Sequence, residues 1–274
     1  MPRIFLLACF TALLFVAPLP AQPVSAKHAR VDLLSQPSAV ASGKYLDLGV
    51  HFTLEQGWHI YWINPGDSGQ PPSFQWQLPQ GFTAGEIEWP RPKKLQSSPT
   101  LADYGYSGDV LLMVPVRVPG EKPQAGRLDL GVQAKWLICR EVCIPDRADL
   151  KLNIPEGRVE TNPQTAALFA KAKMQMPRPW PKSWSAAAES RKDDFLLTIR
   201  QGRPVSRAEF YPLEKGQIEN SAMQRVKATP HGCVITLKKS DLLLKPISVL
   251  RGVLVLDGQA FQIKAAVKTQ VALK

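Results

Sequence analysis

The amino-acid sequence predicts an all-β protein in which a β-sandwich domain, a short helix and a second, smaller β-domain follow one another. Apolar and polar residues alternate in many short runs, and turns rich in Pro, Gly, Asn and Asp separate these runs at the spacing of a sandwich. One Ala- and Lys-rich stretch interrupts this pattern. The predicted divisions are a leader over residues 1–26, a β-sandwich over 27–158, a helical linker over 159–177 and a second β-domain over 178–274.

The leader has the features of a secretory signal peptide. Arg3 precedes an apolar run from Ile4 to Val16, and small residues at Val24-Ser25-Ala26 provide a cleavage site. The apolar run is shorter than the roughly 20 residues that a membrane-spanning helix needs. Leu6-Leu7-Ala8-Cys9 resembles a lipoprotein processing box, but almost no apolar segment precedes it. We therefore expect a cleaved leader and a soluble, exported mature chain.

The charge balance is basic, with 34 Lys and Arg against 23 Asp and Glu and a formal net charge of +11. Such a balance favours solubility and suits acidic partners or an anionic membrane surface. The sequence contains no cluster of five or more Lys and Arg with interleaved aromatic residues. Together with the predicted export, this argues against a nucleic-acid partner.

The clearest strand of the first domain is "YLDLGVHFTL", residues 45–54. Its even-numbered apolar residues, from Leu46 to Leu54, share one face, and Asp47, His51 and Thr53 lie on the other. This pattern is typical of a half-buried strand. Further strands are predicted at residues 73–78, 85–89, 110–118, 128–138 and 149–154.

The helical linker is predicted from a cap and a stop. Asn162 can cap the helix, Pro163 suits its first turn, and Pro177 ends the Ala/Leu/Lys-rich sequence. Beyond it the strand pattern returns, and Asp257-Gly258 predicts a tight hairpin turn between the last two strands. The runs of this second domain cover residues 194–199, 207–212, 224–228, 232–237, 249–256 and 259–267.

Export allows disulfides, and three cysteines remain after Cys9 leaves with the leader. Cys233 lies in an apolar alternating run and is interpreted as a buried structural thiol. Cys139 and Cys143 stand four positions apart, which is about 13 Å in an extended strand, whereas a disulfide needs Cα atoms within roughly 7 Å. Because strand patterns flank the pair on both sides, we expect a tight loop through residues 140–142.

A disulfide that closes so short a loop stabilises the fold only weakly. The loop-entropy relation gives about 2 kcal/mol for so small a ring. Short, solvent-facing bridges are the ones that exchange readily with another thiolate, so redox exchange is the favoured interpretation. A purely structural bridge remains an alternative, as does a Cu(I) site in which His59 or Met113 joins the two thiols.

Three segments carry a resemblance to a known family. "HIYWINPGDSGQPP", "ADYGYSGDVLLMVPV" and "WLICREVCIP", in that order and spacing, resemble the N-terminal periplasmic domain of the DsbD and ScsB family of thiol:disulfide interchange proteins. The match runs from about residue 30 to 155, and "VLRGVLVLDGQAFQI" resembles the second β-domain of the ScsB-like branch. The resemblance implies an immunoglobulin-like β-sandwich carrying a redox pair in the periplasm.

The family's functional residues map onto named positions of this chain. The redox pair would be Cys139 and Cys143, with Cys143 as the nucleophile and Cys139 as the resolving thiol. A cap loop that shields the pair would correspond to Asp103, Tyr104, Gly105 and Tyr106, and the Asp103 carboxylate could adjust thiol acidity. The predicted activity is that of a protein-disulfide reductase or thiol-disulfide oxidoreductase component, with no cofactor and no metal.

The implied partners are a membrane-embedded DsbD- or ScsB-like electron donor or a thioredoxin-like protein, and exported disulfide-containing substrates. The sequence ends at Lys274 without the transmembrane and thioredoxin-like domains of longer family members, so a separate protein is expected to supply or accept electrons. The alternatives that stay open are a copper-binding module and a noncatalytic periplasmic β-module with a structural disulfide.

Two further signals are interpreted as structural. Gly66-Asp67-Ser68-Gly69 resembles the nucleophile loop of trypsin-like proteases, but His51 and His59 lie only a few residues upstream, which does not fit the protease order. Strong turn chemistry explains the stretch. Aromatic residues of the first domain are interpreted as core and rim side chains, namely Trp58, Tyr61, Trp62, Trp76 and Trp89.

Overall fold

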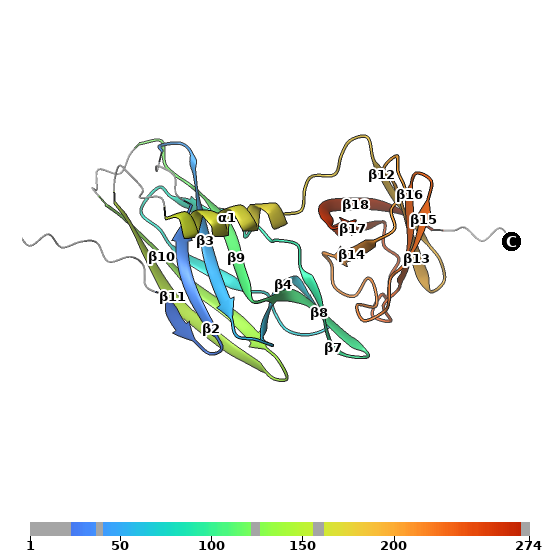
Figure 1. Cartoon of the computed structure of the whole chain (residues 1–274), viewed down its shortest axis with the longest axis horizontal. Helices are drawn as coiled ribbons and strands as arrows, with labels where there is room; N and C mark the ends of the chain where they lie inside the picture. The colour runs from blue at the N-terminus through green and yellow to red at the C-terminus, as the bar shows by residue number, and fades with distance from the viewer. Residues whose placement is uncertain (1–22, 37–40, 122–126, 156–161, 270–274) are drawn as a thin grey trace, which may run out of the picture.

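The structure, a computed structural model, describes residues 23–36, 41–121, 127–155 and 162–269. Figure 1 shows two β-domains side by side along the long axis, with the single labelled helix lying over the first of them. The predicted all-β class is confirmed. Within the described ranges, no helix is both long enough and apolar enough to cross a membrane.

The first domain is a sandwich of two sheets. One sheet contains, in hydrogen-bonded order, β1 (Val24–Ala26), β2 (Ala29–Ser35), β3 (Tyr45–Leu54), β9 (Asp109–Arg117) and β6 (Thr83–Ala84). The other contains β11 (Cys143–Pro155), β10 (Arg127–Cys139), β4 (His59–Gly66), β8 (Leu101–Ser107) and β7 (Lys93–Ser98), with β5 (Ser73–Gln77) paired to β10.

The core of this domain lies between the two sheets, as the alternation of β3 predicts. Leu48, Val50 and Phe52 on β3 are fully buried. The Phe52 ring meets the Trp136 ring of β10 edge to face, with 5.2 Å between ring centroids, so the contact joins one sheet to the other. By contrast, the predicted strand at residues 85–89 forms only an isolated bridge between Glu88 and Met113.

Helix α1 (Pro163–Gln175) covers the outer face of the first sheet (Figure 1). The Asn162 side chain accepts hydrogen bonds from the amides of Gln164 and Thr165, which confirms the predicted cap. Phe169 and Ala172 are buried against Leu111 and Met113 of β9. The segment predicted as a linker therefore also packs on the sandwich, and His51 on the outer face of β3 is only 9% exposed.

The second domain is a single seven-stranded sheet. Its order is β14 (Ala208–Pro212), β17 (Val249–Leu256), β18 (Gln259–Thr269), β12 (Ser185–Ser190), β13 (Asp194–Arg200), β16 (Gly232–Lys238) and β15 (Arg225–Thr229). The β12–β18 pair is parallel and the other pairs are antiparallel.

Two local predictions for this domain agree with the structure. Asp257 and Gly258 have φ values of 46° and 90°, as a tight two-residue hairpin turn between β17 and β18 requires. Cys233 on β16 is a buried free thiol, and burial raises its pKa to about 11. Its environment is that of a core side chain.

The two domains share buried surface. Tyr211, Val253 and Ala260 of the second domain pack into the same cluster as the sandwich core. The Tyr211 ring meets the Tyr104 ring edge to face, with 5.3 Å between centroids. This contact places the β4 and β8 ends of the sandwich against the second domain (Figure 1).

Candidate functional site

The two neighbouring cysteines close the end of a long hairpin. Strands β10 and β11 pair in continuous register until Cys139 lies opposite Cys143, and the two sulfurs form a disulfide with 4.2 Å between the Cα atoms. The chain reverses through residues 140–142, where the Arg140 amide donates to the Val142 carbonyl at 3.2 Å. The predicted tight loop is therefore present, and a regular β-ladder holds it.

The two cysteines differ in their exposure to solvent. Cys139 is 2% exposed, because it closes the last inward position of β10 and also pairs with His59 of β4. Cys143 is exposed, and so is its neighbour Val142 at 63%. An attacking thiolate from another protein can therefore approach Cys143 far more easily than Cys139.

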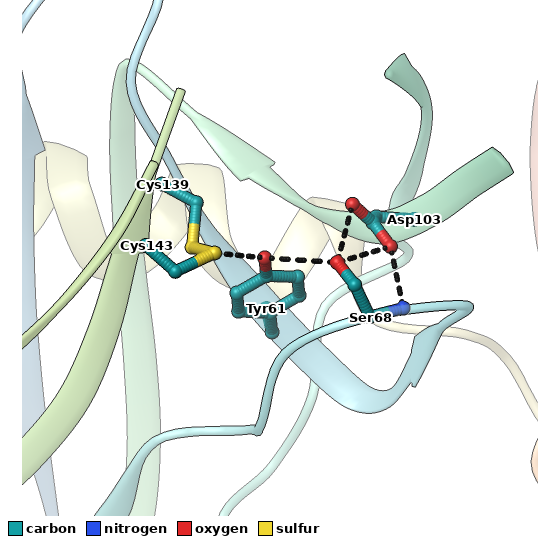
Figure 2. The surroundings of a disulfide bond; sticks show 5 residues. All are labelled: Tyr61, Ser68, Asp103, Cys139 and Cys143. Carbon is teal, nitrogen blue, oxygen red and sulfur yellow. Dashed lines mark hydrogen bonds between the residues drawn. A yellow bond between two sulfur atoms is a disulfide. The ribbon is translucent and has the colours of Figure 1, made fainter. Parts of the chain in front are cut away.

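A chain of hydrogen bonds leads away from Cys143 (Figure 2). The Tyr61 hydroxyl lies 3.2 Å from Cys143 Sγ and 3.3 Å from Ser68 Oγ. Ser68 Oγ lies 2.9 Å and 3.0 Å from the two carboxylate oxygens of Asp103, and the Ser68 amide donates to Asp103 at 2.9 Å. A carboxylate only accepts, so the Ser68 hydroxyl donates to Asp103.

Each member of this chain comes from a different segment. Tyr61 lies on β4, Ser68 on the turn that follows it, and Asp103 on β8. Asp103 is 2% exposed, whereas Ser68 is exposed. The side chains thus link the exposed sulfur to a buried carboxylate that lies 40 positions before Cys143 in the chain.

Two glycines explain how the turn comes so close to Tyr61. Gly66 and Gly69 have φ values of 88° and 71°, in the left-handed region that glycine enters without strain. A Cβ atom on Gly69 would lie 2.1 Å from the Tyr61 ring, and one on Gly66 would lie 2.5 Å from the Ala102 carbonyl oxygen of β8. The glycines of the protease-like stretch therefore allow the turn backbone to pack directly on the ring and on β8.

The aromatic groups beside the sulfurs are held in their neutral forms. Burial raises the pKa of the Tyr61 phenol, partly offset by its hydrogen bond to Ser68, so the hydroxyl keeps a proton to donate. Burial lowers the pKa of His59, whose ring meets Tyr61 edge to face with 5.2 Å between centroids. On the hairpin tip, the Arg140 guanidinium lies 5.3 Å from the centre of the Trp58 ring.

The stretch predicted as a cap loop has a different structure. Asp103, Tyr104, Gly105 and Tyr106 are all buried within β8, which pairs with β4 and β7. The Tyr104 hydroxyl donates to Asn220 at 3.0 Å and the Tyr106 hydroxyl to the Pro90 carbonyl at 2.8 Å, so hydrogen bonds hold both rings in place. Asp103 is the member of this set that joins the hydrogen-bond chain to Cys143.

Only some of the residues that could form a Cu(I) site lie close together. His59 lies opposite Cys139 across β4 and β10, but Met113 packs against α1 on the other sheet. In the part of the chain that the structure covers, no group of three or more His, Cys, Asp or Glu side chains is arranged to hold a metal ion.

Tyr61 and Ser68 are the site residues that sequence reasoning missed. Tyr61 was interpreted as a core aromatic and Ser68 as part of a turn. Both lie in "HIYWINPGDSGQPP", one of the three segments that carry the family resemblance. That segment was therefore the available signal, although nothing in it reveals contact with a cysteine 82 positions away.

Comparison with known proteins identifies the first domain. Residues 30–155 match the model of the family described as thiol:disulfide interchange protein DsbD, N-terminal. These residues form a DsbD N-terminal domain. The family description connects the domain to thiol:disulfide interchange, and the prediction of an immunoglobulin-like sandwich of this family is confirmed. No curated protein matches the chain.

One solved structure is similar over both domains. The N-terminal periplasmic domain of ScsB from Proteus mirabilis aligns with a TM-score of 0.66 and 18% identity, covering 88% of this chain and 93% of that one. At this identity the likeness concerns the fold. The YadV and SfaE chaperones align with TM-scores of 0.23, at 11% and 10% identity, and cover 86% and 87% of this chain and 99% and 100% of their own.

Proposed function

We propose that this protein is a periplasmic thiol:disulfide interchange component that works through Cys139 and Cys143. One observation carries the proposal: an exposed cysteine and a buried cysteine form a short bridge at the tip of a regular hairpin. Such a bridge adds little stability, as its loop is short, yet it presents one sulfur to incoming thiolates. The DsbD N-terminal family match supports the same chemistry.

The exchange is a pair of displacements at sulfur. A partner thiolate attacks Cys143 Sγ, the bond to Cys139 breaks, and Cys139 leaves as a thiolate that takes up a proton. The partner's second thiolate then attacks the partner's own sulfur in this mixed disulfide and releases Cys143. The partner ends as a disulfide, and the Cys139–Cys143 pair has gained two electrons and two protons.

Delivery of these electrons reverses the order. The Cys143 thiolate attacks a disulfide of an exported protein, and Cys139 then attacks Cys143 Sγ to release the substrate as a dithiol. The donor in this proposal is a membrane-embedded DsbD- or ScsB-like protein or a thioredoxin-like protein. The leader over residues 1–26, which would direct the chain to the periplasm, lies largely outside the described residues.

The hydrogen-bond chain can stabilise the Cys143 thiolate. In the reduced protein the thiol can donate to Tyr61, Tyr61 to Ser68, and Ser68 to the Asp103 carboxylate. Once the thiol proton has left, the Tyr61 hydroxyl can turn to donate to the thiolate while Ser68 keeps donating to Asp103. Tyr61 thus stabilises the nucleophile, and Asp103 holds Ser68 in place.

Single-cysteine variants test the proposal. Cys139→Ala should leave Cys143 able to form a stable mixed disulfide with glutathione when treated with glutathione disulfide, because the resolving thiol is absent. Cys143→Ala, the matched control, leaves a thiol at a buried position and should react far more slowly. Intact mass and thermal unfolding are measured for both. If folded Cys139→Ala captures no glutathione, or Cys143→Ala captures it faster, the assignment of Cys143 as the nucleophile is wrong.

A further inference from the structure

The second domain contacts the turn that carries Ser68. The Asn220 side-chain amide donates to Asp67 at 2.7 Å, and the Asn64 amide donates to the Pro212 carbonyl at 2.8 Å. Asn64 and Asn220 are 1% and 6% exposed, so both contacts lie within the domain interface. The turn after β4 is therefore anchored to β14 and to the loop that precedes β15.

Asn220 makes a second contact at the same place. Its carbonyl oxygen accepts from the Tyr104 hydroxyl at 3.0 Å while its amide donates to Asp67. Asp67 directly precedes Ser68, and Tyr104 directly follows Asp103. One side chain of the second domain thus holds Asp67 and Tyr104 together. These two residues are the chain neighbours of Ser68 and Asp103, which form hydrogen bonds with each other.

Contacts within the sandwich complete this arrangement. The other carboxylate oxygen of Asp67 accepts from the Ala102 amide at 2.7 Å, and the Asp67 amide donates to the Ala102 carbonyl at 3.2 Å. Because Ala102 directly precedes Asp103, the two segments are tied together on both sides of the Ser68–Asp103 pair. The contacts between Asp67 and Ala102 lie within the first domain, whereas the contacts of Asn220 depend on the second.

We propose that the second domain positions the redox site, with Asn220 as the positioning residue that holds Asp67 and Tyr104 together. This inference rests on the proposed exchange at Cys143. Separation of the domains would remove the bridge at Asn220, loosen the turn at Ser68 and leave the Tyr61 hydroxyl without a fixed partner at Ser68. The second domain would then act on the reactivity of a sulfur that it does not touch.

The test uses the full two-domain chain in the Cys139→Ala background. Asn220→Ala removes both contacts, and Asn220→Asp keeps the size and the acceptor for Tyr104 but places a second carboxylate against Asp67. The rate of mixed-disulfide formation with glutathione disulfide is measured across pH. Both variants should react roughly threefold or more slowly at pH 7, with the midpoint of the pH profile displaced upward, because a less stabilised thiolate forms at higher pH.

Arg91→Ala is the matched control. Arg91 also joins the two domains, donating to the Gly258 carbonyl at 2.8 Å, but it does not contact the turn at Ser68. Its pH profile should match that of the Cys139→Ala parent. If both folded Asn220 variants keep the parental profile, or Arg91→Ala moves it equally, the positioning role is wrong. If the parent itself does not react with glutathione disulfide, the proposed function fails instead, so the two failures are distinguishable.

Discussion

Tyr61 and Cys143 lie 3.2 Å apart, hydroxyl oxygen to sulfur, although 82 positions separate them in the chain. The contact exists because β4 and β11 belong to the same sheet and β10 lies between them. It brings a hydroxyl that burial keeps protonated to the exposed member of the disulfide. Several properties of the protein should depend on this pair.

Tyr61→Phe should slow thiol exchange. The change removes the hydroxyl that donates to the Cys143 thiolate and leaves the ring packed. Hydrogen bonds to charged groups contribute about 1.5–3 kcal/mol, so at an exposed sulfur we expect the lower end, or about a tenfold loss of exchange rate at neutral pH. The rate of reaction with glutathione disulfide measures this. Tyr45→Phe, at a 68% exposed tyrosine on β3, is the control, and an equal loss there would contradict the role of Tyr61.

Gly69→Ala should disturb the site more than its backbone strain alone would predict. The added Cβ would overlap the Tyr61 ring, and the φ value of 71° strains any residue other than glycine by about 1 kcal/mol. Gly108→Ala carries similar strain at a φ of 74° with nothing within 4 Å of the new atom. Chemical unfolding and the exchange rate of both variants are compared. Only Gly69→Ala should slow exchange, and equal rates would show that the ring does not depend on this packing.

The free energy of unfolding should fall as pH is lowered from 7.5 to 5.5. Burial lowers the pKa of His51 and His59 below 6.5, so in this range the unfolded chain binds more protons than the folded one. The contribution of these two histidines to the free energy of unfolding is complete above pH 6.5 and is lost as the pH falls below it. Asp32 and Glu88, whose pKa burial raises, act with the opposite sign but from starting values of 3.8 and 4.5. Denaturant unfolding across pH measures the slope.

Histidine variants identify the source of that slope. His59→Gln and His51→Gln should each make the free energy of unfolding less dependent on pH, because each removes one of the two imidazoles whose pKa burial lowers. A slope that persists unchanged in His59→Gln would assign the effect to other groups.

The exported protein should begin at Lys27. The Lys27 backbone nitrogen lies 2.8 Å from an Asp146 carboxylate oxygen, so cleavage after Ala26 would create an α-amino cation beside that carboxylate. Because the pair is exposed, Asp146→Asn should cost less than about 1 kcal/mol. Mass spectrometry of the exported chain gives the terminus, and Asp241→Asn is the matched exposed control for stability. A mature chain that retains Val24–Ala26, which form the edge strand β1, would contradict the predicted site.

The sequence predicts strands well where one face is buried and the other meets solvent. The run at residues 45–54 coincides with β3, and the turn at Asp257-Gly258 lies where its chemistry indicates. Strands β4 and β8 lack such alternation, because most of their residues are buried on both faces. Their patterns therefore carry no period of two, and neither strand was predicted from its own sequence.

The candidate site, like the fold, could be predicted from the sequence only in part. The sequence favoured a Cys139–Cys143 pair and left a Cu(I) site open, and the structure contains the disulfide. The stretch expected as a cap loop, Asp103 to Tyr106, lies in the buried strand β8, and the Tyr104 and Tyr106 hydroxyls bind Asn220 and the Pro90 carbonyl. Its shielding of the sulfurs stays a prediction. The link from Ser68 to Asp103 depends on how closely the turn approaches β8, which only the folded chain determines.

The burial of Cys139 determines the order in which other proteins can react with the cysteine pair. With a single reachable sulfur, the pair can be joined covalently to one protein at a time. In the proposed exchange, the donor and the recipient must therefore bind one after the other. An excess of either should inhibit the reaction with the other. The expected kinetics are ping-pong, with no complex in which both bind this hairpin tip together.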